Sequence, residues 1–373
     1  MKIVKYLFYL SAVIFPLGVL ASFKLVGLAD VRIVFLDVLT ALIVLACYNR
    51  ITKDQVLSGG WGWFAAAAAL SLLVNIKEYE LWQVGIGSLY LLRFITYLVL
   101  LSILREFKLK TIKILEWGGI SVALLGLFQF LFYPNLRNLV YLSWDPHLGR
   151  LFSTFLDPQF VGIILVLTLL LLLAKLKEFN WLRLLYIGMV GIALILTFSR
   201  SSYLAFVVGM MILFLNKSKR LHYLVSVTAL GFIAVIYLVF INSSEGVGQN
   251  LFRSETVVSR IESWNQAVAV WQQRPFLGTG FNTYRYAGII KGKAFNNAGA
   301  GVDNSFLFVL ATTGVLGLAA YMYFWKRLLY NASPEVFSIA SALFIHATFN
   351  NTLFYPWVLW WIVVYFASLR ESS

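Results

Sequence analysis

The chain has 373 residues, of which 61% are hydrophobic and 12% charged, with a mean hydropathy of +0.83 and a formal net charge of +14. Soluble domains do not tolerate apolar runs of about 20 residues repeated along their length, so the composition excludes a soluble globular protein. The single cysteine, Cys47, lies in an apolar run, which excludes a disulfide framework. Walker and Rossmann glycine patterns are absent, which argues against ATP hydrolysis and dinucleotide chemistry.

Apolar runs recur along the whole chain and predict an all-α polytopic membrane protein with about 12 transmembrane helices. We expect them to form one integral membrane domain over residues 1–373. A large external loop is predicted between spans nine and ten. The predicted spans cover residues 3–20, 31–48, 60–75, 81–104, 112–133, 159–175, 181–197, 200–216, 221–241, 303–325, 335–350 and 353–369.

Lysines and arginines set the predicted orientation of these spans. They gather in alternate connections, for example at 105–113 and 217–220, and positive charge marks the cytoplasmic side of a membrane protein. The protein is therefore expected in the cytoplasmic (inner) membrane, in contact with its lipids and with both termini in the cytoplasm. The placement of lysines and arginines in cytoplasmic connections accounts for the net positive charge of the chain. No nucleic-acid partner is therefore expected.

Two charged residues, Asp37 and Arg93, fall inside predicted spans two and four. A lone charge in the hydrocarbon core costs several kcal/mol, so we expect the two to form an ion pair. A role in substrate binding is the alternative.

Three arginines on the predicted external side are candidate phosphate ligands, because a planar guanidinium binds phosphate through two parallel hydrogen bonds. Arg150 lies in SWDPHLGRLFSTFLDPQF (143–160), where two Asp-Pro pairs indicate irregular backbone before span six. Arg200 lies in TFSRSS, a connection too short to solvate it easily. For Arg200 the alternative is contact with lipid headgroups.

The predicted external loop covers residues 242–302, and connections of this length are usually functional or disordered. Within it, residues of about 255–273 predict an amphipathic helix, which Ser254 can cap and Pro275 ends. Arg260, the third candidate, falls at the edge of the apolar stripe and can direct its guanidinium to the membrane surface, or can be an ordinary solvated arginine. The stripe consists of Val257, Ile261, Trp264, Val268 and Trp271.

Span ten opens with Asp303 and Asn304, a carboxylate and an amide at the external end of a helix. Asp303 is a candidate catalytic base or the N-cap of the helix. His346, four residues before Asn350, is a second candidate base or a buried, hydrogen-bonded core histidine. The chain has no DxD or HExxH motif and no cysteine pair, so neither a metal site nor a cofactor is predicted.

Four stretches together resemble the O-antigen ligase and O-antigen polymerase superfamily of membrane glycosyltransferases. They are RLFSTFLDPQFVG, TFSRSSYLAF, SRIESWNQAVAVWQQRPFLGTGFNTY and DNSFLFVLATTGVLGL, in this order along the chain. The resemblance implies a polyprenyl-diphosphate-linked oligosaccharide as donor, transferred to a glycan or lipid acceptor outside the cytoplasmic membrane, without a nucleotide sugar or metal. It also implies that Arg200 and Arg260, which match the family's essential external arginines, bind the donor diphosphate.

One departure from the resemblance concerns span ten. The ligases carry a histidine where this chain has Asp303, while Asn304 and Gly314 fit the ligase spacing and are taken as supporting residues. We therefore expect an inverting, metal-independent glycosyltransferase that polymerises or ligates surface polysaccharide, with polymerisation favoured. A lipid-glycan flippase is the alternative, although no internal repeat is visible. A non-catalytic assembly partner in the same pathway is a third possibility.

Overall fold

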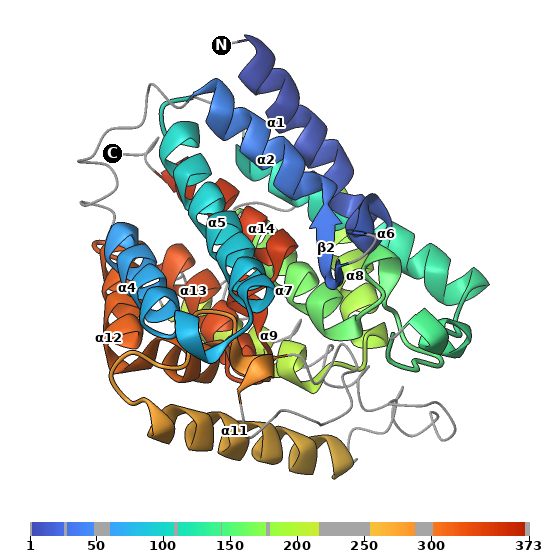
Figure 1. Cartoon of the computed structure of the whole chain (residues 1–373). Helices are drawn as coiled ribbons and strands as arrows, with labels where there is room; N and C mark the ends of the chain where they lie inside the picture. The colour runs from blue at the N-terminus through green and yellow to red at the C-terminus, as the bar shows by residue number, and fades with distance from the viewer. Residues whose placement is uncertain are drawn as a thin grey trace.

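A computed structural model describes residues 2–25, 28–47, 60–107, 111–142, 144–176, 180–215, 254–287 and 301–369 (Figure 1). The predicted span 221–241 and the loop segments 242–253 and 288–300 lie outside the described residues. The described helices are α1 Lys2–Ile14, α2 Phe35–Ala46, α4 Trp61–Val74, α5 Leu81–Leu104, α6 Thr111–Phe132, α7 Pro158–Ala174, α8 Trp181–Leu196, α9 Arg200–Phe214, α11 Glu255–Gln273, α12 Ser305–Leu328, α13 Pro334–Ala347 and α14 Pro356–Ser368.

Among the described residues, four helical segments are long and apolar enough to cross a membrane: Lys2–Ala21, Leu81–Leu104, Thr111–Phe132 and Ser305–Leu328. Seven further helices are apolar but only 10–17 residues long. This pattern is that of a multi-pass helical membrane protein. The count of about 12 spans stays a prediction.

A β-hairpin departs from the all-α prediction. Strands β1 (Ser22–Leu25) and β2 (Leu28–Val34) pair in antiparallel register, with Lys24 opposite Arg32. The helix predicted over 31–48 therefore begins only at Phe35. The β-branched residues of β2 favour a strand, and an apolar run alone does not distinguish a strand from the start of a helix.

The first predicted span is also interrupted. Helix α1 ends at Ile14, and a 3₁₀ helix, η1, follows over Phe15–Ala21. Pro16 has no N–H to continue the α-helical hydrogen bonds, and its carbonyl oxygen accepts a 2.6 Å bond from Thr154 Oγ1. The chain therefore bends where it meets the segment before α7.

Helices α7 and α14 form the centre of the bundle. Almost every residue of both helices is buried, and Trp357, Trp360 and Trp361 of α14 are at most 2% exposed. A helix that is apolar on all sides is expected in the interior, where other helices surround it. Helices α6, α8, α9 and α13 pack against α7, and α2, α5 and α6 pack against α14. Helix α11 lies across one end of the bundle (Figure 1).

The predicted intramembrane ion pair is confirmed. Arg93 Nη2 lies 2.7 Å from Asp37 Oδ2, which joins α5 to α2. Tyr97 of α5 donates a 3.0 Å hydrogen bond to the other carboxylate oxygen of Asp37. The charge of each partner is thus compensated within the bundle.

Candidate active site

Helix α11 packs on the bundle with a different face from the predicted stripe. Ala267 and Val270 are at most 1% exposed, whereas Val257 and Ile261 of the stripe are 44% and 47% exposed. Both buried residues lie in the second half of α11, and α11 packs against α12. The first half of α11 therefore keeps apolar side chains on its surface.

The segment after α11 is inserted into a break in helix α12. Thr279 N and Gly280 N donate to the carbonyl oxygens of Ala311 and Thr312 at 3.1 and 3.0 Å. In the other direction, Val315 N donates to Pro275 O at 2.9 Å, and Leu316 N donates to Phe276 O at 3.3 Å. These bonds replace those that residues 311, 312, 315 and 316 would make in a continuous helix. We call residues 274–280 and 311–316 together the α12 joint.

Two glycines make the α12 joint possible. Gly314 has φ 67° and Gly278 has φ 66°, a conformation that L side chains rarely adopt. A Cβ atom at Gly314 would lie 2.2 Å from Phe276 O, and one at Gly278 would lie 2.3 Å from Thr312 C. Gly314 is thus required by the backbone of the joint, and it does not line the cavity described below.

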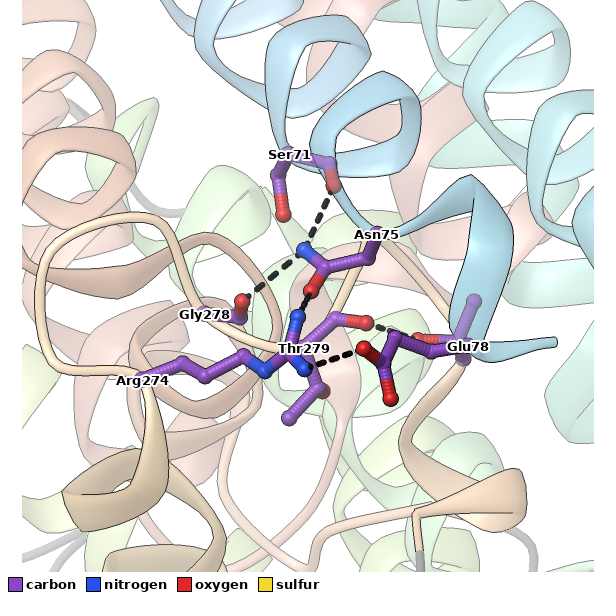
Figure 2. Close-up of polar contacts among 7 residues, drawn as sticks. Ser71, Asn75, Glu78, Arg274, Gly278 and Thr279 are labelled. Atoms are coloured by element: carbon purple, nitrogen blue, oxygen red, sulfur yellow. Dashed lines mark hydrogen bonds and ion pairs between the residues drawn. The ribbon is translucent and has the colours of Figure 1, made fainter.

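Polar side chains at and just after the C-terminal end of α4 tie the α12 joint to the bundle (Figure 2). Asn75 Nδ2 donates to Ser71 O at 2.7 Å and to Gly278 O at 3.0 Å. Arg274 donates to Asn75 Oδ1 and lies 2.8 Å from Glu78 Oε1. No sequence motif singled out these residues, although Ser71 and Asn75 are polar and one helical turn apart at the end of a predicted span.

A cavity of about 660 Å³ opens beside α11, within the roughly 300–1,000 Å³ range of ligand sites. Its lining includes Arg150, Arg260 and Asp303, three of the predicted site residues. A second cavity of about 330 Å³ lies between α9 and α11, with Arg200 at its edge. Arg260 borders both cavities, so the structure brings four of the predicted residues to two adjoining spaces. The second cavity is otherwise lined by Ser201, Leu204, Val257, Ile261, Trp264 and Phe349.

The backbone of Asp303 is attached to α11. Its N–H donates to Ser263 Oγ at 3.3 Å, and Trp264 Nε1 donates to its carbonyl oxygen at 3.2 Å. The N-cap of α12 is Asn304, whose Oδ1 accepts bonds of 2.8 and 3.0 Å from the next helical N–H groups, so the capping role considered for Asp303 is wrong. Burial raises the pKa of the Asp303 carboxyl to about 6, and the nearby charge of Arg260 opposes this rise.

Arg260 belongs to the first half of α11, and Arg200 of α9 contacts the same half. Arg260 Nη2 donates to Gln159 Oε1 at 2.8 Å, and its guanidinium lies 5.8 Å from the centre of the Phe349 ring. Arg200, at the start of α9, donates to Thr256 Oγ1, one turn before Arg260. Burial lowers the pKa of Arg260, an effect that the carboxylate of Asp303 partly offsets. An additional anion beside Arg260 would therefore be favoured.

Arg150 is held differently from the other two arginines. It is only 4% exposed, and its guanidinium donates to the carbonyl oxygens of Thr197 and Phe198 at 3.0 and 3.3 Å. These bonds hold the short connection between α8 and α9, and Arg200 is the first residue of α9. Arg150 therefore lines the cavity while supporting the backbone on which Arg200 stands.

His346 lines neither cavity. It is fully buried, and its Nδ1 lies 2.7 Å from Thr352 Oγ1. Its Nε2 lies 3.5 Å from Nδ2 of Asn350, which does line the larger cavity. This geometry matches the hydrogen-bonded core histidine considered as the alternative.

The fold and the site define a multi-pass helical membrane protein with an arginine-bearing polar cavity at the end of the bundle that α11 covers. Residues 184–322 match a family described as O-antigen ligase. This match supports the O-antigen ligase and O-antigen polymerase superfamily. No curated protein matches it. The matched segment contains Arg200, Arg260 and Asp303 but neither Arg150 nor His346.

The match to this family supports a glycosyltransferase-like membrane enzyme of the ligase or polymerase type. At this coarse level it implies a lipid-linked glycan as substrate and a glycan as acceptor. Among the described residues, no group of three or more His, Cys, Asp or Glu side chains could hold a metal ion.

Proposed function

We propose that this protein transfers a glycan from a polyprenyl diphosphate carrier to an acceptor hydroxyl at the outer face of the cytoplasmic membrane. The transfer inverts the anomeric centre and needs no metal ion, and chain polymerisation is favoured over ligation. The observation that carries this proposal is that Arg260 and Asp303 line one cavity. Arg260 belongs to α11, and the backbone of Asp303 is hydrogen-bonded to the same helix.

Arg260 and Arg200 bind the diphosphate in this proposal. Fixed positive charge at the leaving group stabilises the negative charge that develops as the bond between the anomeric carbon and the phosphate oxygen breaks. Arg260 exchanges its bond to Gln159 for a phosphate oxygen, and Arg200 exchanges its bond to Thr256. A guanidinium presents five donors, so partial contact with the protein can persist during binding.

Asp303 acts as the base. The acceptor oxygen attacks the anomeric carbon from the side opposite the diphosphate, and its proton passes to the Asp303 carboxylate. A pKa of about 6 leaves this group mainly ionised at neutral pH yet close enough to neutrality for efficient proton transfer. Aspartate in place of the ligase histidine is the reason for favouring polymerisation.

The decisive experiment incubates the purified protein with a polyprenyl-diphosphate-linked oligosaccharide and separates the products by size. Longer chains support polymerisation, and transfer to an added acceptor supports ligation. We expect Arg260→Ala to abolish either reaction, and Arg260→Lys to restore little because the planar fork is lost. Lys326→Ala, an exposed change at the far end of α12, is the matched control. Movement of the lipid-linked glycan across vesicles without transfer would favour the flippase instead.

The proposed orientation has its own test. Cysteine introduced at the exposed Gln272 of α11 should react with a membrane-impermeant thiol reagent in intact spheroplasts, whereas cysteine at the exposed Lys326 should react only after lysis. The native Cys47 is buried and contributes little background. The opposite labelling pattern would place α11 in the cytoplasm and refute transfer at the outer face.

A further inference from the structure

The larger cavity has a second wall that the proposed reaction does not use. It consists of Arg32 on β2, Tyr90 and Arg93 on α5, and Trp144, and we call it the β2–α5 wall. The residues assigned to catalysis, Arg260 and Asp303, belong to α11 and the start of α12. A ligand that fills the cavity therefore meets Arg32 and Trp144 as well as the catalytic side.

Arg93 has a structural role in this wall. Its charge is paired with Asp37 at 2.7 Å, and its guanidinium lies 4.8 Å from the centre of the Tyr90 ring. It also donates a 2.9 Å hydrogen bond to the carbonyl oxygen of Arg32. Arg93 thus holds strand β2 in place at the position from which the Arg32 side chain leaves the backbone.

The Arg32 side chain stacks on an aromatic ring. Its guanidinium carbon lies 4.7 Å from the centre of the Trp144 ring, and its hydrogen bond to Ser22 Oγ is long, at 3.5 Å. No carboxylate of the described residues forms an ion pair with it. Stacking on indole orients a guanidinium but leaves most of its five donors available. A half-buried charge of this kind is suited to an anionic partner.

We propose that Arg32, Trp144 and Tyr90 form a subsite for a carboxylate-bearing sugar residue of the glycan. The planar fork of Arg32 matches a carboxylate through two parallel hydrogen bonds, which a neutral hydroxyl cannot accept with the same strength. The aromatic rings offer apolar surface to the C–H bonds of a pyranose ring.

The position of the subsite assigns this sugar to the acceptor. It shares its cavity with Asp303, so an acceptor bound there presents hydroxyl groups toward the base, while the donor diphosphate lies beside Arg260 and Arg200. This assignment rests on the proposed function, whereas the recognition of an acidic sugar does not.

The test measures binding of methyl β-D-glucuronide and methyl β-D-glucoside to the full-length protein in lipid nanodiscs, by saturation-transfer NMR. We expect the glucuronide to bind at least about tenfold more tightly, the scale of one charge-assisted hydrogen bond. Arg32→Met, which keeps an apolar stem over Trp144, should remove the preference. Arg32→Lys should keep part of it, and Arg260→Met, the matched control in the same cavity, should leave it intact. Each variant is first checked for an unchanged unfolding temperature.

Several outcomes would overturn the inference. Equal binding of the two glycosides by the wild type would refute recognition of the carboxylate, and so would an unchanged preference in both Arg32 variants. If inorganic phosphate competed as well as the glucuronide and Trp144→Leu changed neither affinity, the site would be a simple anion site. Binding needs no turnover, so an Arg32-dependent preference in a protein that transfers nothing would refute the proposed function alone.

Discussion

The two sides of the larger cavity are built by different interactions. The α11–α12 side rests mainly on four backbone–backbone hydrogen bonds in the α12 joint, and the side chains of Ser263 and Trp264 hold the backbone of Asp303. The β2–α5 wall rests on side chains, namely the pair Asp37–Arg93 and the stacking of Arg32 on Trp144. Backbone bonds hold catalytic groups within the narrow tolerances that chemistry needs, whereas side-chain contacts can adapt to a ligand. We therefore expect the catalytic side to be the more rigid of the two.

The largest effect is expected from breaking the α12 joint itself. Gly314→Ala places a Cβ atom 2.2 Å from Phe276 O in a backbone with φ 67°. A strained φ and an overpacked site together cost about 2–6 kcal/mol, so the yield of folded protein and its unfolding temperature should both fall. Gly188→Ala is the control, since nothing lies within 4 Å of its added Cβ atom. Equal behaviour of the two variants would show that the joint is not needed for folding.

The second-largest effect is expected on glycan transfer when Asp303 alone is changed. Asp303→Asn should lower transfer by at least about a hundredfold, the usual scale for loss of a general base. The unfolding temperature should not change, because Asn304 caps α12. Asn304→Ala should instead lower the stability by about 1 kcal/mol, because the N-cap is lost, and should leave the catalytic base in place. Asp303→His should recover part of the transfer if the position serves the ligase histidine's role.

If Asp303→Asn turned over normally and His346→Ala lost all transfer, His346 would be the catalytic base. The geometry argues against this outcome, because His346 does not line the cavity.

The dependence of transfer on pH should report the same carboxyl group. The base must be ionised, so transfer should rise as the pH increases through about 6, the pKa of Asp303, and then level off. Because the charge of Arg260 lowers this pKa, Arg260→Gln should raise the pKa of Asp303, as titration of the carboxyl group by infrared spectroscopy would show without need of turnover. A flat profile between pH 5 and about 8 in the wild type would exclude a base of this pKa.

The smallest effects are expected where side chains support the α12 joint. Asn75 is 1% exposed and bridges Ser71 and Gly278, so Asn75→Ala should cost about 1–3 kcal/mol of stability. Glu78 is 55% exposed, and Glu78→Gln should cost less than about 1 kcal/mol because water screens its pair with Arg274. Urea titrations of both variants in detergent would rank them. A larger loss in Glu78→Gln would show that the exposed ion pair is the stronger support.

Much of the helical framework could be predicted from the sequence, because it depends on local patterns. Helix α5 occupies Leu81–Leu104, the range predicted for span four, and α11 occupies Glu255–Gln273. Long apolar runs with polar ends specify such helices without reference to the rest of the chain. The ion pair of Asp37 with Arg93 followed from the cost of an isolated charge in the membrane. The family also followed from ordered local stretches and is supported by the match over 184–322.

Only the tertiary structure decided how these pieces meet. In the folded protein Asn304 caps α12 and Asp303 lies near Arg260, although both Asp and Asn are good N-caps. The tertiary structure buried Arg150 on two carbonyl groups and placed His346 behind the cavity. Helix α12 is interrupted at Gly314, where residues 275–280 insert, although these residues lie far from Gly314 in the sequence. Hydrogen bonds between distant segments depend on where the whole chain places each backbone group, and no local pattern carries that information.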